Sequence, residues 1–175
     1  AARVGAQHSQ DYSAWYSQIP GLKVIAPFSA ADYKGLLKAA IRDPNPVIFL
    51  ENEVLYGHTG EVPKLDDYVI PIGKARMVRE GNDLTVISWG ATVNRAALAA
   101  QRLEAEGISV EVVDLRTVKP IDEAIVLADR VLIMLHNDPD PDAMASGLAL
   151  RNVLHRTKAT AIIGAVQGVT RPENL

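Results

Sequence analysis

The sequence alternates short apolar runs with amphipathic segments along most of its 175 residues, and this alternation limits the folds open to it. Residues 22–27 (LKVIAP) form the first strand-like run. Ser29 and Asp32 then match a capping box at the start of a helix. In that helix, a repeat close to 3.6 residues places one apolar set on a common face: Tyr33, Leu36, Leu37, Ala40 and Ile41. The first unit is therefore predicted to be a strand followed by a helix.

The same alternation continues along the chain. Residues 47–50 (VIFL) are a continuous apolar run, as expected of a strand buried on both faces. Further strands are predicted at residues 84–88, 110–115, 131–135 and 159–165, and further helices at residues 91–106, 124–128 and 142–155. Strands that alternate with helices pair in parallel through right-handed crossovers. We therefore expect an α/β fold, a parallel sheet with flanking helices.

Composition excludes several classes of protein. The chain is 48% apolar and 22% charged, which is typical of globular domains. No apolar run approaches the roughly 18–20 residues that cross a bilayer, and the N-terminal residues lack a secretory signal pattern. We therefore expect no membrane partner and a cytoplasmic location. The net charge of −3, without a basic stripe, argues against nucleic acid as a partner. The absence of cysteine excludes disulfides and thiolate chemistry.

Three blocks of sequence carry a family resemblance: HSQDYSAWY at 8–16, AIRDPNPVIFLENE at 40–53 and VEVVDLRTVKPID at 110–122. On these blocks the chain resembles the beta subunit of the first component of pyruvate dehydrogenases, which are thiamine-diphosphate enzymes. The resemblance implies a partial transketolase-like pyrimidine-binding domain, a linker, and the start of a transketolase C-terminal-like domain with a Rossmann-like βαβ unit. The corresponding segments are residues 1–55, 56–80 and 81–122.

The resemblance also implies site residues. His8 falls where the family places an active-site histidine that assists acyl transfer to a lipoyl group. The AIRDPN turn matches a site for a monovalent cation such as K⁺, held by the backbone carbonyls of Ala40, Ile41, Asp43 and Asn45. The alternatives, on the residues alone, are a hydrogen-bonded structural histidine and a plain end of a helix.

The partners implied are an alpha subunit and a lipoyl acyltransferase core. In the family the alpha subunit holds the diphosphate, and the glutamate that activates the cofactor aligns upstream of Ala1. Thiamine diphosphate is therefore not expected to bind this chain alone. Self-association is expected, because half of a parallel-sheet domain leaves the strand at 47–50 uncovered. Arg116 and Lys119 are interpreted either as contacts to a neighbouring subunit or as a solvated strand end.

A second resemblance lies in the segment 123–175. Residues 136–150 (HNDPDPDAMASGLAL) resemble the N-terminal motif of the DHH phosphoesterase superfamily. The resemblance implies that His136, Asp140 and Asp142 hold a divalent Mn or Mg ion, and these are ligand types that suit Mn²⁺. The alternative is an acidic, proline-stiffened loop in which Asp142 caps a helix. Because the family's other ligands would follow the last residue, we expect weak metal binding without hydrolysis.

Together these patterns predict a fragment of a pyruvate dehydrogenase (acetyl-transferring) type beta subunit, inactive alone. Its apparent junction with a phosphoesterase-like segment near residue 122 suggests a chimera or fusion. One alternative is a fragment of a manganese-dependent phosphoesterase or exonuclease. A further alternative is a non-catalytic α/β scaffold that keeps the fold and partial sites.

Overall fold

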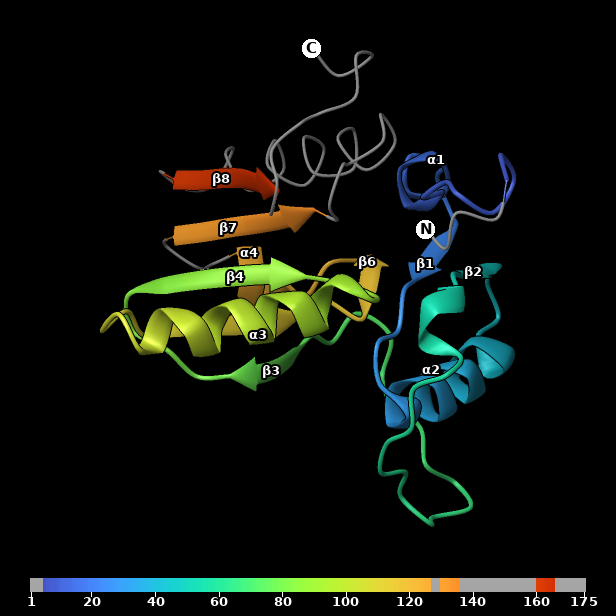
Figure 1. Cartoon of the computed structure of the whole chain (residues 1–175). Helices are drawn as coiled ribbons and strands as arrows, with labels where there is room; N and C mark the ends of the chain where they lie inside the picture. The colour runs from blue at the N-terminus through green and yellow to red at the C-terminus, as the bar shows by residue number, and fades with distance from the viewer. Residues whose placement is uncertain (1–4, 127–129, 136–159, 166–175) are drawn as a thin grey trace.

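Two sheets organise the chain. The computed structural model describes residues 5–126, 130–135 and 160–165. A three-stranded sheet has the order β2-β1-β6, and a five-stranded sheet has the order β3-β5-β4-β7-β8. Figure 1 shows the smaller sheet with its helix α2 beside the larger sheet. The predicted α/β class is therefore confirmed.

The smaller sheet is built from the first part of the chain. Its elements are α1 (Ser13–Ser17), β1 (Lys23–Ile25), α2 (Ala30–Arg42), β2 (Val47–Phe49) and the short 3-10 helix η1 (Glu53–Leu55). At the start of α2, the Asp32 backbone N–H donates to Ser29 Oγ at 3.2 Å, and the Ser29 N–H donates to Asp32 Oδ2 at 3.1 Å. The predicted capping box is therefore present, and it fixes where α2 begins.

The larger sheet follows a segment without helix or strand at residues 56–75. Its elements are β3 (Arg76–Arg79), β4 (Leu84–Ser88), α3 (Thr92–Glu104), β5 (Val110–Asp114), β7 (Arg130–Leu135) and β8 (Thr160–Ala165); β6 (Thr117–Lys119) and α4 (Glu123–Val126) lie between β5 and β7. Strands β5, β4, β7 and β8 pair in parallel, as predicted. Strand β3 pairs antiparallel with β5, so the sheet is mixed.

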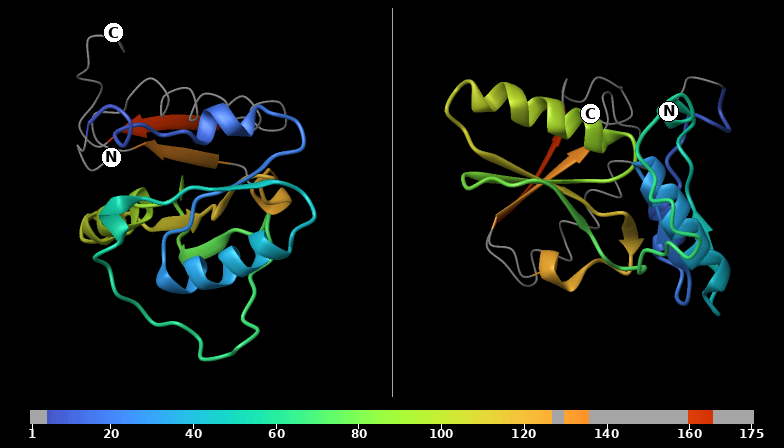
Figure 2. Two further views of the ribbon diagram at one scale, coloured as in Figure 1. Left: turned by 90° about the vertical axis from the view of Figure 1, so that its right-hand side faces the viewer. Right: turned by 90° about the horizontal axis from the view of Figure 1, so that it is seen from below.

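One face of the larger sheet is covered by α3 (Figure 2). The helix buries a stripe of small apolar side chains against the strands: Val93, Ala96 and Ala100. Ala96 and Ala100 pack in one cluster with Val86, Val110 and Val112 of β4 and β5. Gly107, with a φ of +82°, donates its N–H to the carbonyl of Glu104 at 3.0 Å just beyond the helix. A glycine in the left-handed conformation thus follows the end of the helix, as is common at helix C-termini.

Two expectations about the smaller sheet are wrong. Residues 47–50 do not form a strand buried on both faces, because β2 is an edge strand and its three residues are half-buried. The predicted apolar face of α2 is also only partly covered. Leu36 is fully buried, whereas Leu37 is 44% exposed and Ile41 is 76% exposed. The smaller sheet is too narrow to cover the whole face of its helix.

The two sheets are joined by a crossing of the chain that the sequence did not predict. After β5, the chain turns at Arg116, whose φ is +56°, and enters β6. Strand β6 then pairs antiparallel with β1 of the smaller sheet. The Ala26 N–H donates to the Arg116 carbonyl at 2.9 Å, and the Gly90 N–H donates to the Ala26 carbonyl at 3.2 Å. A segment expected to belong to the second unit therefore completes the sheet of the first.

A shared core also spans this crossing. Ala26, which follows β1, packs in one cluster with buried side chains of the larger unit: Ile87, Trp89, Val113, Leu115 and Ile125. Burial of apolar surface in this cluster stabilises the contact between the two sheets. The predicted boundaries at residues 55, 80 and 122 stay predictions. Each sheet also has a cluster of its own, around Leu36 in the smaller unit and around Val112 in the larger one, and the shared cluster joins the two.

Candidate functional site

His8 lies in a turn before α1, and two side chains stabilise this turn by hydrogen bonds to backbone carbonyls. Gln10 Nε2 donates to the Ala6 carbonyl at 2.7 Å, and Tyr12 Oη donates to the Gln7 carbonyl at 3.0 Å. Side-chain to backbone bonds of this kind replace regular secondary structure in a turn. They hold the His8 backbone between two anchored residues.

The turn brings His8 to η1, far away in the sequence. His8 Nδ1 lies 3.6 Å from Glu53 Oε1, with side-chain exposures of 63% and 39%. An exposed pair at this distance contributes little to stability. The Glu53 carboxylate instead orients the His8 ring. A carboxylate facing Nδ1 favours the tautomer with the proton on that nitrogen and directs Nε2 toward solvent. Glu53 was not singled out from the sequence, since a contact between two loops has no periodic signal.

The predicted monovalent-cation residues gather where α2 ends. The Asp43 N–H donates to the Ala40 carbonyl at 3.3 Å, and the Asp43 carboxylate accepts from the Asn45 N–H at 2.9 Å. Lys23 Nζ donates to Asp43 Oδ2 at 2.5 Å. This hydrogen bond, followed by those from Asn45, lowers the pKa of Asp43 to about 2. The side chain of Asp43 is therefore occupied by Lys23, and backbone carbonyls are what this corner has left to offer a cation.

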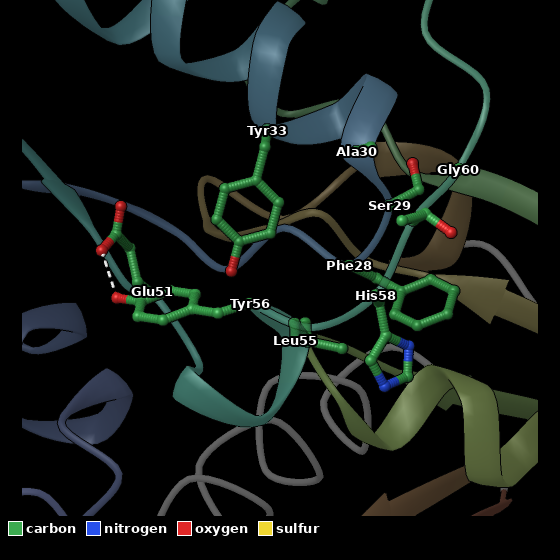
Figure 3. A pocket seen from close by; sticks show the side chains of 10 residues that line it. Phe28, Ser29, Ala30, Tyr33, Glu51, Leu55, Tyr56, His58 and Gly60 are labelled. Atoms are coloured by element: carbon green, nitrogen blue, oxygen red, sulfur yellow. Dashed lines mark hydrogen bonds between the residues drawn. The ribbon is translucent and has the colours of Figure 1, made fainter.

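A cavity of about 440 Å³ lies at the start of α2 (Figure 3). It is lined by Phe28, Ser29, Ala30, Tyr33, Glu51, Leu55, Tyr56, His58, Thr59 and Gly60. Figure 3 shows Tyr33 reaching down from α2 toward Tyr56 and Glu51, while His58 and Phe28 form the other side. Tyr56 Oη donates to Glu51 Oε2 at 2.7 Å. The cavity therefore combines aromatic faces with one carboxylate, and His8 is not among its lining residues.

The two tyrosines of the cavity stay protonated at neutral pH. The hydrogen bond to Glu51 raises the pKa of Tyr56 to about 12. Burial raises the pKa of Tyr33, although the Asn52 N–H that donates to Tyr33 Oη opposes this shift. Both side chains therefore act as neutral hydrogen-bonding groups rather than as bases. Sequence reasoning missed this cavity because its walls come from two stretches far apart in the sequence, residues 28–33 and 51–60.

The predicted divalent-metal residues cannot be placed. His136, Asp140 and Asp142 lie outside the described residues. Within the part of the chain that is described, no group of three or more His, Asp or Glu side chains is arranged to hold a metal ion. Among the same residues, no helix is long and apolar enough to cross a membrane.

Arg116 and Lys119, by contrast, have partners within the chain. Arg116 Nη2 lies 2.7 Å from Asp32 Oδ1, and the Arg116 side chain is only 14% exposed. Lys119 Nζ donates to the Ile19 carbonyl at 2.7 Å. The interpretation as a solvated strand end is therefore wrong for Arg116, whereas the hydrogen bond of Lys119 lies at an exposed position. Both side chains tie the crossing segment to the smaller unit.

Comparison with known proteins places this arrangement in a family. The family described as "Transketolase, pyrimidine binding domain" matches residues 1–59, and "Transketolase, C-terminal domain" matches residues 73–172. The second match covers more than half of the chain. The chain belongs to the transketolase family. The C-terminal match also includes most of the segment 123–175, where the sequence suggested a phosphoesterase.

Relatives of this transketolase-family chain include named pyruvate dehydrogenase subunits. It is 66% identical over 127 residues to the pyruvate dehydrogenase E1 component subunit beta of Rhizobium meliloti, covering 73% of this chain and 28% of that protein. It is 55% identical over 131 residues to the mitochondrial subunit beta-1 of Arabidopsis thaliana, covering 73% of this chain and 36% of that protein. The chain therefore spans about a third of the length of these relatives and corresponds to a fragment of such a subunit.

A solved structure shares the arrangement of both sheets. It is described as "Split gene transketolase, inactive beta4 tetramer", with a TM-score of 0.68 and 26% identity. The likeness covers 89% of this chain and 52% of that one. It therefore extends across both units rather than over one of them.

Proposed function

We propose that this chain is the part of a pyruvate dehydrogenase type beta subunit that presents an acid–base histidine to the active site. The assembled enzyme would decarboxylate pyruvate oxidatively and pass the acyl group to a lipoyl group. The observation that carries the proposal is the 66% identity to a named beta subunit, together with the pyrimidine-domain match over residues 1–59, which includes His8.

His8 is proposed to move a proton at Nε2. Glu53 faces Nδ1 at 3.6 Å, so Nε2 is the nitrogen directed away from the protein. An imidazole can both donate and accept a proton, which suits it to acid–base work during acyl transfer. The exposure of 63% is consistent with a site that is completed by another chain.

We infer that thiamine diphosphate is shared with an alpha subunit. The support is the identity to named beta subunits, in whose family the alpha subunit holds the diphosphate. The exposed apolar side chains Leu37 and Ile41 support association of this unit with another copy or subunit. We further propose that the assembled enzyme binds a lipoyl acyltransferase core and that it is located in the cytoplasm.

A structural cation such as K⁺ is proposed at the end of α2. The carbonyls of Ala40, Ile41, Asp43 and Asn45 lie in the last turn of this helix and the segment after it, where the macrodipole favours positive charge. Lys23 already supplies one positive charge at this corner through Asp43. A bound cation would therefore contact the backbone rather than the Asp43 carboxylate.

The second candidate function rests on sequence alone. His136, Asp140 and Asp142 have the spacing of a phosphoesterase motif, which supports a chimera that binds Mn²⁺ or Mg²⁺ weakly. The transketolase C-terminal match through residue 172 favours a single family over a chimera. Titration with Mn²⁺ of the chain and of Asp140→Asn distinguishes the two: equal affinities would exclude the metal site.

The first test of the main proposal uses the chain by itself. Titration calorimetry with thiamine diphosphate and Mg²⁺ should detect no tight binding, because the cofactor is shared with another subunit. Micromolar affinity of the isolated chain would contradict the proposal.

The second test places His8 in an assembled enzyme. The segment replaces the matching segment of a relative's beta subunit, and the resulting subunit is expressed with the matching alpha subunit. His8→Gln should lower acyl transfer to a lipoyl acceptor by about 100-fold or more, the usual contribution of a positioned acid–base group. Decarboxylation followed with an artificial electron acceptor is the internal control and should change much less. Equal losses in both assays would show that His8 is structural.

A further inference from the structure

We propose that a buried cluster of charged side chains acts as a proton-sensitive latch between the two sheets. This junction cluster consists of Asp32, Arg76, Asp114 and Arg116. Asp32 lies in the first turn of α2, in the smaller unit, whereas Arg76 and Asp114 are cross-strand neighbours on β3 and β5 of the larger sheet. Arg116 lies in the crossing that leads to β6. The cluster therefore includes residues from both units and from the segment that connects them.

Arg76 bridges the two carboxylates with one guanidinium group. Its Nη1 lies 3.5 Å from Asp32 Oδ2, and its Nη2 lies 3.6 Å from Asp114 Oδ2. Nη1 also donates to Ser29 Oγ at 3.3 Å. Arg116 completes the bridge on the other side, with Nη2 at 2.7 Å from Asp32 Oδ1. Each arginine therefore links the smaller unit to the larger one.

The two carboxylates are not equally supplied with donors. Both side chains are fully buried, at 0% exposure. Asp32 receives the Ser29 hydroxyl at 2.5 Å and the Ser29 N–H at 3.1 Å in addition to both arginines. Asp114 accepts the Arg116 N–H at 3.0 Å and has the more distant contact to Arg76. A buried charge with fewer donors is the first to be neutralised by a proton.

Asp114 is therefore the proton-binding member of the cluster. Burial, and after it the negative charge of Asp32, raises the pKa of Asp114 from 3.8 to about 7, although the Arg116 N–H and the charges of Arg76 and Arg116 oppose the shift. These are the charged groups that face it from α2, from β3 and from the crossing. Near pH 6 the cluster holds one proton, and above pH 8 it holds two buried carboxylates that repel each other.

Backbone hydrogen bonds link the Asp114 carboxylate to the turn that joins the two sheets. Arg116 has a left-handed φ of +56°, a conformation that non-glycine residues adopt only when their surroundings fix it. Its N–H is held by the Asp114 carboxylate, and its carbonyl accepts the Ala26 N–H at 2.9 Å. A change in charge at Asp114 therefore acts on the turn that directs β6 into the smaller sheet.

The expected direction follows from the raised pKa. Between about pH 4 and pH 7 the folded chain keeps a proton on Asp114 that the unfolded chain releases, so folding becomes less favourable as the pH rises. The stabilisation is complete below the unfolded pKa near 3.8 and is lost as the pH rises through about 7. The contact between the two units is thus more stable when Asp114 is protonated, below about pH 7, and less stable when it is ionised.

The equilibrium test compares the chain with Asp114→Asn, which keeps the size of the side chain and an oxygen to accept the Arg116 N–H. Between pH 5 and pH 8.5 the folding equilibrium constant of the wild type should fall on the order of 100-fold more than that of the variant, tenfold for each of the two pH units below the folded pKa. Parallel pH profiles for the two proteins would overturn the proposal.

Carboxyl NMR tests whether the two aspartates are coupled. The Asp114 signal should titrate near pH 7 in the wild type and at a lower pH in Asp32→Asn, where the neighbouring negative charge is gone. An Asp114 midpoint near 4 in the wild type would overturn the proposal. The wild-type titration decides this point even if Asp32→Asn fails to fold.

Hydrogen exchange tests whether the effect reaches the junction. The amides of Ala26 and Gly90 bridge the two units, whereas the Val112 amide lies within the larger sheet and reports the loss of global stability over the same range. Between pH 6 and pH 8.5, protection of the Ala26 and Gly90 amides should fall in the wild type relative to Asp114→Asn, by at least as much as that of Val112. Unchanged protection of Ala26 and Gly90 relative to the variant would overturn the proposal.

Discussion

The two units of this chain fold by different means. In the larger unit, β4, α3 and β5 follow one another in sequence and pack directly together, so its core is largely local. In the smaller unit, β1 lies between β2 and β6. Strand β6 comes after β4 and β5 of the larger unit in the sequence. The third strand of the smaller sheet therefore reaches it through the larger unit, and part of the smaller unit's core is formed with side chains of the larger one.

The polar interactions differ in the same way. In the larger unit, β4 and β5 pair in parallel without a register shift from Leu84–Val110 to Ser88–Asp114. The smaller unit is attached through Asp32, whose buried carboxylate needs arginines from the larger unit and the crossing. Buried ion pairs contribute little net stability when intact, but removing one partner is costly. They therefore specify how the two units are oriented more than they stabilise either of them.

The largest loss of stability is expected from a substitution in the core of the larger unit. Ile87 is fully buried in the cluster that spans both units. Ile87→Ala should lower the free energy of unfolding by about 2–5 kcal/mol, because it removes buried methyl groups and leaves a cavity. Ile41→Ala, the same change at a side chain that is 76% exposed, should cost less than about 0.5 kcal/mol. Denaturant unfolding measures both, and a similar loss in the two variants would remove the distinction between the units.

A second change tests the turn that leads into β4. A Cβ on Gly81 would lie 2.2 Å from the Glu111 backbone N and 2.2 Å from the Val110 carbonyl carbon, so the backbone itself would have to move. Gly81→Ala should therefore cost about 1–3 kcal/mol or more. Gly57→Ala is the control, because nothing lies within 4 Å of its added Cβ. If thermal unfolding shows Gly81→Ala to be as stable as the control, the close approach of this turn to β5 is wrong.

A smaller effect is expected where α2 begins, in the smaller unit. Ser29→Ala removes the acceptor for the Asp32 N–H and should cost about 1 kcal/mol. Ser29→Thr keeps a hydroxyl and should recover most of this loss. The measurement is the free energy of unfolding, together with hydrogen exchange in α2. Ser29→Thr as unstable as Ser29→Ala would argue against the capping role.

The smallest effect concerns acid. The hydrogen bond from Lys23 lowers the pKa of Asp43 to about 2, so its contribution to stability is complete above the unfolded value of 3.8 and is lost as the pH falls through about 2. Asp43→Asn should flatten the acid limb of the stability profile between pH 4 and pH 2. Asp114→Asn is the opposite control, since Asp114 changes stability between about pH 4 and pH 7 and in the opposite direction. An unchanged acid limb in Asp43→Asn would show that Lys23 and Asp43 do not pair in solution.

Local sequence was sufficient where one element carries the whole signal. The capping box of Ser29 and Asp32 and the strand at residues 84–88 appear in the structure as predicted, and the helix predicted at residues 91–106 corresponds to α3 at Thr92–Glu104. The strands at 131–135 and 159–165 also correspond to β7 and β8, to within one residue at each end. In each case the pattern lies within a few turns or one strand, so hydrophobic periodicity reports it directly.

The candidate site was predictable only in part. His8 was found through its sequence block, but its partner Glu53 was not, because the two meet across a turn and a short 3-10 helix. The cavity beside Tyr33 and Tyr56 was missed for the same reason. Residues from separate loops share no spacing, and only the fold determines which of them meet.

The sequence by itself determined the α/β class, the alternation of strands and helices, and the family, because these depend on local periodicity and on dense sequence blocks. Only the tertiary structure decided that β3 runs antiparallel and that β6 joins the smaller sheet. Strands of three or four residues are too short to show a period. Likewise, Asp32 and Arg116 are ordinary polar residues until the crossing of the chain buries them together, where desolvation makes their pairing necessary.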